Sequence, residues 1–267
     1  MSLGAISSYR VEAFNTALAS ENRIHDDVTA RRFGFNGGLV PGVEVYAYMA
    51  HVPVAAYSRA WLERGGLECR FLKPVYDGRI AIVSARRQED GLELGVESDG
   101  VHCAVGRAWL AAAPGEAPSL EPQAPAPPAE RPPASVESLV HGRVLGIHPQ
   151  LIDEDRLCSY LADIRETEAL YLGEQLVHPG LILRLANAAL TQNVVLGPWI
   201  HVGSEVQNFA AARIGDRLTL SSRVTSNREH KGHAIVELEA LAMAEGKPIS
   251  AIRHTAIWRP RQLAEPA

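Results

Sequence analysis

The chain has 267 residues, of which 46% are hydrophobic, and a formal net charge of −5. It can bury one large core or two ordinary ones, and nothing in it approaches the roughly eighteen consecutive apolar residues of a membrane-spanning helix. The acidic balance and scattered basic residues argue against nucleic-acid binding, and the 3 cysteines are too few and too widely spaced to indicate a disulfide framework or a metal site.

The amino-terminal segment lacks a basic region followed by an apolar core, so we expect no secretory signal, no membrane association and a cytoplasmic location. Residues 9–18 (YRVEAFNTAL) have helical character. They are followed by a polar run, residues 20–27 (SENRIHDD), and then by Pro41-Gly42 at the start of a long apolar segment.

That apolar segment, residues 43–64, is typical of a buried helix, and it ends at Gly65-Gly66. Pro53 should kink or divide the helix, because a proline removes a backbone hydrogen bond. Four β-rich runs separated by turn signals follow, at residues 67–72, 79–87, 92–98 and 101–111. A helix that is apolar nearly all round must be wrapped, and a curved antiparallel sheet is the simplest wrapper.

Residues 114–133 are rich in proline and alanine, so we expect an extended segment that does not pair in a sheet. The predicted division is therefore an N-terminal domain (1–113), a linker (114–135) and a C-terminal domain (136–267). The C-terminal domain repeats the order of elements, with a helix near residues 181–195 and strands near residues 202–209, 217–226, 233–244 and 249–258.

The two halves also share landmarks at a constant spacing, which indicates an internal duplication. Each landmark recurs 138 residues further along the chain: Pro41-Gly42 as Pro179-Gly180, Phe71 as Phe209, and Arg79 as Arg217. The residue at the same spacing from His25 is Asp163, so we do not expect a second identical site in the C-terminal half.

Asn22, Ile24 and His25 match the motif Asp-x-Asn-x-x-His, which precedes the central helix of the MaoC-like dehydratases, the R-specific enoyl-CoA hydratases. The chain resembles this family most specifically over residues 14–42, although Ser20 stands at the position of the motif Asp. The resemblance implies an α+β double hot-dog fold with two antiparallel sheets, each wrapped around a central helix. It also implies that a groove between the halves binds an acyl-CoA or acyl-carrier thioester, as substrate and not as cofactor.

In that family the Asp and the His hold one water, which adds across the double bond of an enoyl thioester. The resemblance therefore implies that His25 is the acid/base, that Asn22 positions it, and that the backbone N–H of Gly42 holds the thioester carbonyl. Such chemistry needs an acid and a base whose pKa values lie near the working pH, and a helix N-terminus stabilises the charge that develops on the carbonyl.

Ser20 cannot take over the role of the Asp directly, because a serine hydroxyl does not titrate in the useful range. It would hydrogen-bond to water or orient the histidine, although the role of a helix-end or turn hydroxyl is favoured over a catalytic one. Glu21 or Asp26 could approach from another angle, and Asp27 is expected to be structural. The leading activity is reversible hydration of an enoyl thioester by a homodimer. Thioester hydrolysis and a non-catalytic acyl-CoA-binding or partner subunit remain as alternatives, and the missing Asp favours the binding subunit.

Several further residues have simpler expected roles. His178 should mark the entry into the second central helix, and residues 163–166 should form a solvated helical face from which Arg165 could meet a phosphate of coenzyme A. Tyrosines and a tryptophan at helical spacing should lie in the core or line an acyl pocket, with the core favoured; these are Tyr46, Tyr48, Tyr57 and Trp61.

Overall fold

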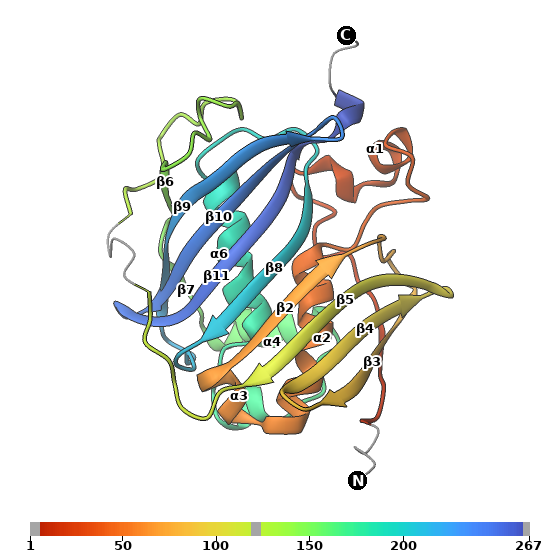
Figure 1. The fold of residues 1–267 in the computed structure, drawn as a ribbon, viewed down its shortest axis with the longest axis vertical. Coiled ribbons are helices and arrows are strands. Elements are labelled where there is room, and N and C mark those ends of the chain that lie inside the picture. The colour runs from red at the N-terminus through yellow and green to blue at the C-terminus, as the bar shows by residue number, and fades with distance from the viewer. Residues whose placement is uncertain (1–5, 119–123, 264–267) are drawn as a thin grey trace.

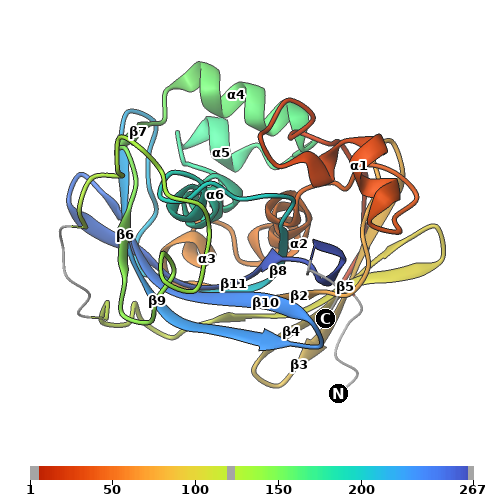
Figure 2. The ribbon, with the colours of Figure 1, turned by 90° about the horizontal axis from the view of Figure 1, so that it is seen from above.

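The computed structural model describes residues 6–118 and 124–263. In these residues one antiparallel sheet curls around two central helices, α2 (Gly42–Tyr57) and α6 (Pro179–Thr191) (Figure 1). Figure 2 shows the two helices side by side in the hollow of the sheet, with α4 and α5 beyond them.

The remaining elements of the first half are β1 (Tyr9–Glu12), η1 (Arg23–His25), α1 (Asp27–Arg32), α3 (Arg59–Arg64), β2 (Gly65–Phe71), β3 (Ile80–Gln88), β4 (Gly91–Ser98) and β5 (Val101–Leu110). Those of the second half are β6 (Val144–Gly146), β7 (Gln150–Leu151), α4 (Glu154–Asp163), α5 (Leu170–Gly173), β8 (Ile200–Asn208), β9 (Arg217–His230), β10 (His233–Ala244), β11 (Lys247–Arg259) and η2 (Arg261–Leu263). No helix among the described residues is long and apolar enough to cross a membrane.

The two predicted antiparallel sheets, one from each half, are joined edge to edge. The strand order is β1-β3-β4-β5-β2-β8-β11-β10-β9-β6, and β7 pairs with β9. At the junction β2 runs antiparallel to β8, with Leu67 opposite Val206 and Cys69 opposite Ser204. Each half would otherwise expose the backbone groups of an edge strand here, and the pairing satisfies both edges at once.

The central helix of the first half ends later than its proline suggests. A division at Pro53 is wrong: α2 continues through Pro53 to Tyr57, and the chain turns at Ser58, whose φ of 53° lies in the left-handed region. Val52 and Val54 are buried on either side of the proline. Packing of the helix on all sides thus outweighs the loss of one backbone hydrogen bond.

The helical character expected for residues 9–18 is also wrong. Tyr9–Glu12 forms strand β1, which pairs with β3 so that Tyr9 lies opposite Val83. Val11 points into the core and is 3% exposed. The open edge of β3 provides backbone partners that a short local helix cannot match.

A partly buried ion pair connects the two central helices, with 32% of the Arg184 side chain exposed. The side chain of Glu44 on α2 is 1% exposed, and its Oε1 accepts a hydrogen bond of 2.9 Å from Nε of Arg184 on α6. Nη2 of Arg184 and the hydroxyl of Thr16 also donate to the same oxygen, at 2.5 Å and 3.0 Å. This contact links residues that lie 140 positions apart in the chain.

A second buried carboxylate, Glu166, contacts residues of both halves, and it corrects the expectation of a solvated face. Glu166 has only 2% of its side chain exposed, and it lies 2.7 Å from Nδ1 of His51 and 3.4 Å from Nε2 of His178. Burial alone would raise the pKa of Glu166, but hydrogen bonds with His178 and His51 outweigh this and hold the pKa far below its ordinary value. Glu166 therefore helps to hold the halves together.

The expected linker is only partly unpaired. Residues 119–123 lie outside the described part of the chain, but the linker's C-terminal end contacts the second half. The N–H of Val195 donates to the carbonyl of Pro132 at 2.8 Å, and the N–H of Ala134 donates to the carbonyl of Val195 at 2.9 Å. Proline itself cannot donate, so Pro132 takes part through its carbonyl and the first residue after the two prolines, Ala134, supplies the N–H.

Candidate functional site

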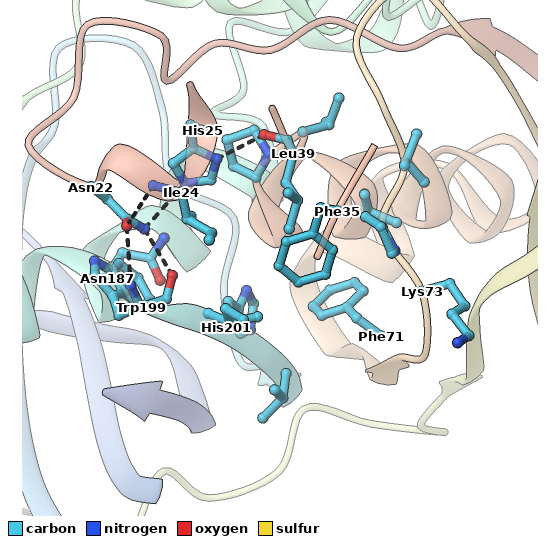
Figure 3. A pocket seen from close by; sticks show the side chains of 18 of the residues that line it. Asn22, Ile24, His25, Phe35, Leu39, Phe71, Lys73, Asn187, Trp199 and His201 are labelled. Atoms are coloured by element: carbon cyan, nitrogen blue, oxygen red, sulfur yellow. Dashed lines mark hydrogen bonds between the residues drawn. The ribbon is translucent and has the colours of Figure 1, made fainter. Parts of the chain in front are cut away.

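A cavity of about 220 Å³ opens at the N-terminus of α2 and is lined by residues of both halves (Figure 3). The first half contributes His25, Phe35 and Phe71, and the second half contributes Asn187, Trp199 and His201. Aromatic and aliphatic side chains make up most of the wall, and a few polar atoms face the space between them. This combination is typical of a small-molecule site.

The segment before α2 is folded by local capping. Asn22 caps the short helix η1, with its Oδ1 accepting from the N–H of Ile24 at 3.4 Å. Asp26 then caps α1 through the N–H of Thr29 at 2.8 Å. Ile24 is buried between these two caps. The spacing of the two capping residues turns the side chains of Asn22 and His25 toward the cavity.

Two hydrogen-bond partners determine which ring nitrogen of His25 carries the proton. Its Nδ1 lies 2.7 Å from the carbonyl oxygen of Leu39, which can only accept, so Nδ1 carries the proton. Its Nε2 lies 3.3 Å from the amide nitrogen of Asn22, which can only donate. Burial lowers the pKa of His25, and the Leu39 carbonyl offsets this in part. His25 is therefore a neutral imidazole whose basic atom is Nε2, and the lone pair of this atom accepts the hydrogen bond from Asn22.

The sequence suggested that Asn22 positions His25. In the structure Asn22 also contacts the second half. Its Nδ2 donates to the carbonyl of Trp199 at 3.0 Å, and its Oδ1 accepts from the N–H of Trp199 at 3.1 Å. Trp199 precedes β8, so this two-bond contact fastens the motif of the first half to the wall contributed by the second half. Local sequence carries no signal for a contact between residues 177 positions apart.

Gly42 is the first residue of α2 and lines the cavity, as its expected role requires. Its N–H has no partner within the helix, because the first N–H groups of a helix lack acceptors in the preceding turn. A Cβ at this position would lie 2.8 Å from Nδ1 of His201 and 2.9 Å from Cε2 of Phe71. Only glycine leaves room here for both side chains and a ligand.

Ser20 is the motif residue that does not line the cavity. Its hydroxyl donates a hydrogen bond of 3.3 Å to the carbonyl of Asn22. In this arrangement the serine supports the turn that leads into η1.

The neighbouring carboxylates are also directed elsewhere. Glu21 forms an exposed ion pair of 3.0 Å with Arg131. Asp26 caps α1, and Asp27 accepts a hydrogen bond of 2.8 Å from the N–H of Gly38. Among the described residues, no aspartate or glutamate lines the cavity. The two histidines and Lys73 are its titratable groups.

Two polar residues of the second half were missed by sequence reasoning. His201, on β8, is 7% exposed, and Asn187, on α6, has an Oδ1 that is buried without a hydrogen-bond partner among the described residues. Burial and the nearby His254 lower the pKa of His201 well below its ordinary value. A lone histidine in a strand and a lone asparagine in a helix give no recognisable motif, so no sequence signal pointed to either.

A groove of about 650 Å³ adjoins the cavity and shares Phe35, Lys73 and Pro74 with it. Arg79 also lines this groove, and its guanidinium lies 3.6 Å from Asp99. Arg165, which the sequence suggested for a phosphate contact, lines neither space. Its guanidinium instead lies 5.2 Å from the centre of the Phe14 ring.

The corresponding place in the second half is filled by protein. His178 caps α6 by accepting a hydrogen bond of 3.0 Å from the N–H of Gly180, which confirms its role at the helix entry. The hydroxyl of Tyr160 occupies the space next to Gly180. Asp163, which stands where a second His25 would be, lies at the end of α4.

No protein-family model matches the chain, and no curated protein matches its sequence significantly. Its structure is similar to solved double hot-dog proteins. One, described as a MaoC domain protein dehydratase from Chloroflexus aurantiacus, shares 12% identity at a TM-score of 0.65, over 96% of this chain and 94% of that one. A conserved hypothetical protein from Mycobacterium tuberculosis with a double hot-dog fold shares 18% identity at a TM-score of 0.63, over 96% of both chains.

A third solved structure, described as a MaoC-like dehydratase, shares 13% identity at a TM-score of 0.56, over 96% of this chain and 98% of that one. At these identities the likeness establishes the fold. The double hot-dog fold predicted from the sequence is thus confirmed.

Proposed function

We propose that this double hot-dog protein binds an acyl-CoA or acyl-carrier thioester and reversibly hydrates its enoyl form. One observation carries the proposal: the Nε2 lone pair of His25 and the free start of α2 at Gly42 meet in one cavity. Addition of water to an enoyl thioester requires a base for the water, an acid for the α-carbon and stabilisation of the charge on the carbonyl. His25 can serve first as the base and then as the acid, and the helix N-terminus can stabilise the charge. The descriptions of two similar structures as MaoC-type dehydratases support the same reaction class.

The reaction can be written with His25 as the one titrating group. Nε2 exchanges its hydrogen bond from Asn22 for one from water and takes a proton from that water while the water oxygen bonds to the β-carbon. The electron pair of the C=C bond then forms a bond between the α-carbon and the carbonyl carbon, and the π pair of the carbonyl moves onto its oxygen. The N–H of Gly42 and the start of α2 stabilise that oxygen. The imidazolium of His25 then returns the proton to the α-carbon, and the carbonyl re-forms. Because one group takes and returns the proton, hydrogen and hydroxyl add to the same face.

The product formed from crotonyl-CoA tests this proposal directly. Hydration yields a 3-hydroxyacyl-CoA, whereas thioester hydrolysis releases the free thiol of coenzyme A. Chromatography with mass detection distinguishes the two. Release of thiol without a hydroxyacyl product would contradict the proposal.

A non-catalytic acyl-thioester-binding subunit is the second candidate. The serine at position 20 and the lack of a lining carboxylate among the described residues favour it. Measurable binding of crotonyl-CoA with neither product would support this candidate over hydration.

The hydration rate is expected to depend on pH through His25. Since burial places the pKa of His25 below its ordinary value of 6.5, the base form predominates at neutral pH. We expect kcat/KM for crotonyl-CoA to be flat between about pH 7 and 8 and to fall only below the ordinary histidine pKa. A profile that already declines from pH 8 toward pH 7 would contradict this assignment.

Coenzyme A thioesters are expected to stabilise the folded protein. At one hundred times the dissociation constant, binding should add roughly 2.7 kcal/mol to the free energy of unfolding, measured as a thermal shift. Lys73, exposed where cavity and groove meet, should attract the phosphates, so Lys73→Gln should weaken binding of butyryl-CoA.

Two controls separate the phosphate contact from a general effect of charge. The N-acetylcysteamine thioester, which lacks phosphates, should bind Lys73→Gln and wild type equally. Lys247→Gln removes an exposed lysine at the start of β11, away from the groove, and should leave both affinities unchanged. Absence of any shift with short and long acyl-CoA would point to another ligand class.

A further inference from the structure

A buried chain of three polar side chains leads to the cavity from the second half. Nε2 of His201 lies 2.8 Å from Oγ of Ser204, and the same Oγ lies 2.9 Å from Nδ1 of His254. The exposed fractions of the three residues are 7%, 5% and 1%. The two imidazole rings lie close together, with centroids 4.2 Å apart. The mechanism written above uses none of these residues.

The outer end of this chain faces the ligand space. Nδ1 of His201 is buried and has no hydrogen-bond partner among the described residues, while His201 itself lines the cavity. A Cβ on Gly42 would lie 2.8 Å from this nitrogen, so Nδ1 lies beside the start of α2. In Figure 3, His201 lies beneath the pair of Asn22 and His25 and next to Phe71. An unpartnered buried polar group of this kind is costly, and a ligand atom that pairs with it recovers that cost.

His201 acts as a neutral group. Its burial and the neighbouring His254 both disfavour the charged form, so its pKa lies well below the ordinary value. A neutral imidazole carries one N–H, and the hydrogen bond at one nitrogen decides which nitrogen has it.

Ser204 links the protonation patterns of the two histidines. Its single hydroxyl proton can be donated to one imidazole only, and its oxygen then accepts from the other. When Nδ1–H of His254 donates to Ser204 and Ser204 donates to Nε2 of His201, the proton of His201 is placed on Nδ1, facing the cavity. This pattern requires no net charge on the buried chain.

We propose that His201 is a second hydrogen-bond donor to the thioester carbonyl, acting through Nδ1–H beside the backbone N–H of Gly42, and that Ser204 and His254 hold it in that tautomer. The inference rests on the proposed thioester ligand. Two donors then converge on the oxygen that becomes negatively charged as water adds. The second half thereby contributes a catalytic residue to a site whose base comes from the first half, and Ser204 and His254 are positioning residues.

Isotope-edited infrared spectroscopy tests the donor role without turnover. Butyryl-CoA labelled with carbon-13 at the carbonyl is saturated, so hydration cannot consume it. Its carbonyl band should move to lower wavenumber on binding wild type, and His201→Leu should lose much of that movement. His201→Asn keeps an amide N–H near the position of Nδ1 and should retain a large part of it.

Kinetics provides the second measurement. His201→Leu should lower kcat for crotonyl-CoA by about 10²–10³-fold, the usual effect of removing one oxyanion donor, with a much smaller change in KM. Ser204→Ala should lower kcat in the same direction, and Ser204→Thr, which keeps the hydroxyl, should restore it. A merely structural role for Ser204 would change the thermal midpoint but not this split between kcat and KM.

The tautomer of His201 can be measured directly in the wild-type protein. Nitrogen-15 NMR of the histidines, with His201 assigned by its loss in His201→Asn, should show Nδ1–H when butyryl-CoA is bound. Persistent protonation at Nε2 in the complex would overturn the inference even if the leucine variant did not fold.

The outcomes for His201 and for hydration are separable. Hydration with unchanged carbonyl band and kcat in His201→Leu would overturn the donor role alone. A band movement that depends on His201, in a protein that does not hydrate crotonyl-CoA, would support the donor role while the hydratase proposal fails. If no thioester binds wild type, both fail.

Discussion

Replacing His25 with alanine is expected to lower the rate of enoyl-thioester hydration by about 10²–10⁴-fold, the typical contribution of a positioned acid or base. The cavity lining holds no aspartate or glutamate among the described residues, so no neighbouring carboxylate can take over proton transfer. Affinity for butyryl-CoA should change little, because the donor at Gly42 is part of the backbone. Initial rates with crotonyl-CoA and calorimetric titration with butyryl-CoA measure the two effects.

The exposed His148 lies outside the cavity lining, so His148→Ala is the matched control and should leave the rate unchanged. If His25→Ala alters only stability, or if wild type is inactive, the binding-subunit function replaces the enzymatic one.

Ser20→Asp extends the same experiment by restoring the carboxylate of the motif. It should raise hydration turnover, by up to about 10²-fold, the lower end of what a positioned base contributes. The gain requires the new side chain to turn away from the carbonyl of Asn22, which the serine hydroxyl contacts. Ser20→Asn, of equal size without charge, is the control. A fast wild type that is slowed by Ser20→Asp would show that another group already supplies the second role.

Arg184→Met is expected to lower the free energy of unfolding by about 3–5 kcal/mol, since it leaves the buried carboxylate of Glu44 without its charged partner. Urea unfolding at pH 7 measures the loss. The double variant Glu44→Gln/Arg184→Met should recover much of it, because the uncompensated charge is gone. The double-mutant cycle then isolates the pairwise contribution.

A surface pair provides the comparison for this ion pair. Arg253 lies 3.0 Å from Glu205, but its side chain is 69% exposed. Arg253→Met should cost no more than about 1 kcal/mol. Equal losses from Arg184→Met and Arg253→Met would contradict the assignment of a partly buried, stabilising contact between the central helices.

Local patterns alone located most of the strands and the first part of the site. The run 233–244 was predicted as a strand and forms β10 (His233–Ala244). The prediction succeeds because alternating apolar residues and flanking turn residues are signals that act over a few neighbouring positions. The paired Pro-Gly landmarks predicted the starts of two central helices, and Gly42 and Pro179 are the first residues of α2 and α6. The motif likewise led to His25 and Asn22, which line the cavity.

Tertiary structure alone decided how the two halves meet and what faces His25. Pairing of β2 with β8 depends on which strand edges come together, and no local pattern encodes that choice. The same junction brings His201 and Trp199 to the N-terminus of α2. The helix ends at Tyr57, beyond Pro53, because packing on all sides outweighs one missing hydrogen bond. The sequence by itself thus determined the fold class and one wall of the site. Contacts between residues more than a hundred positions apart decided the opposite wall. Such contacts depend on long-range packing and not on neighbours in the chain.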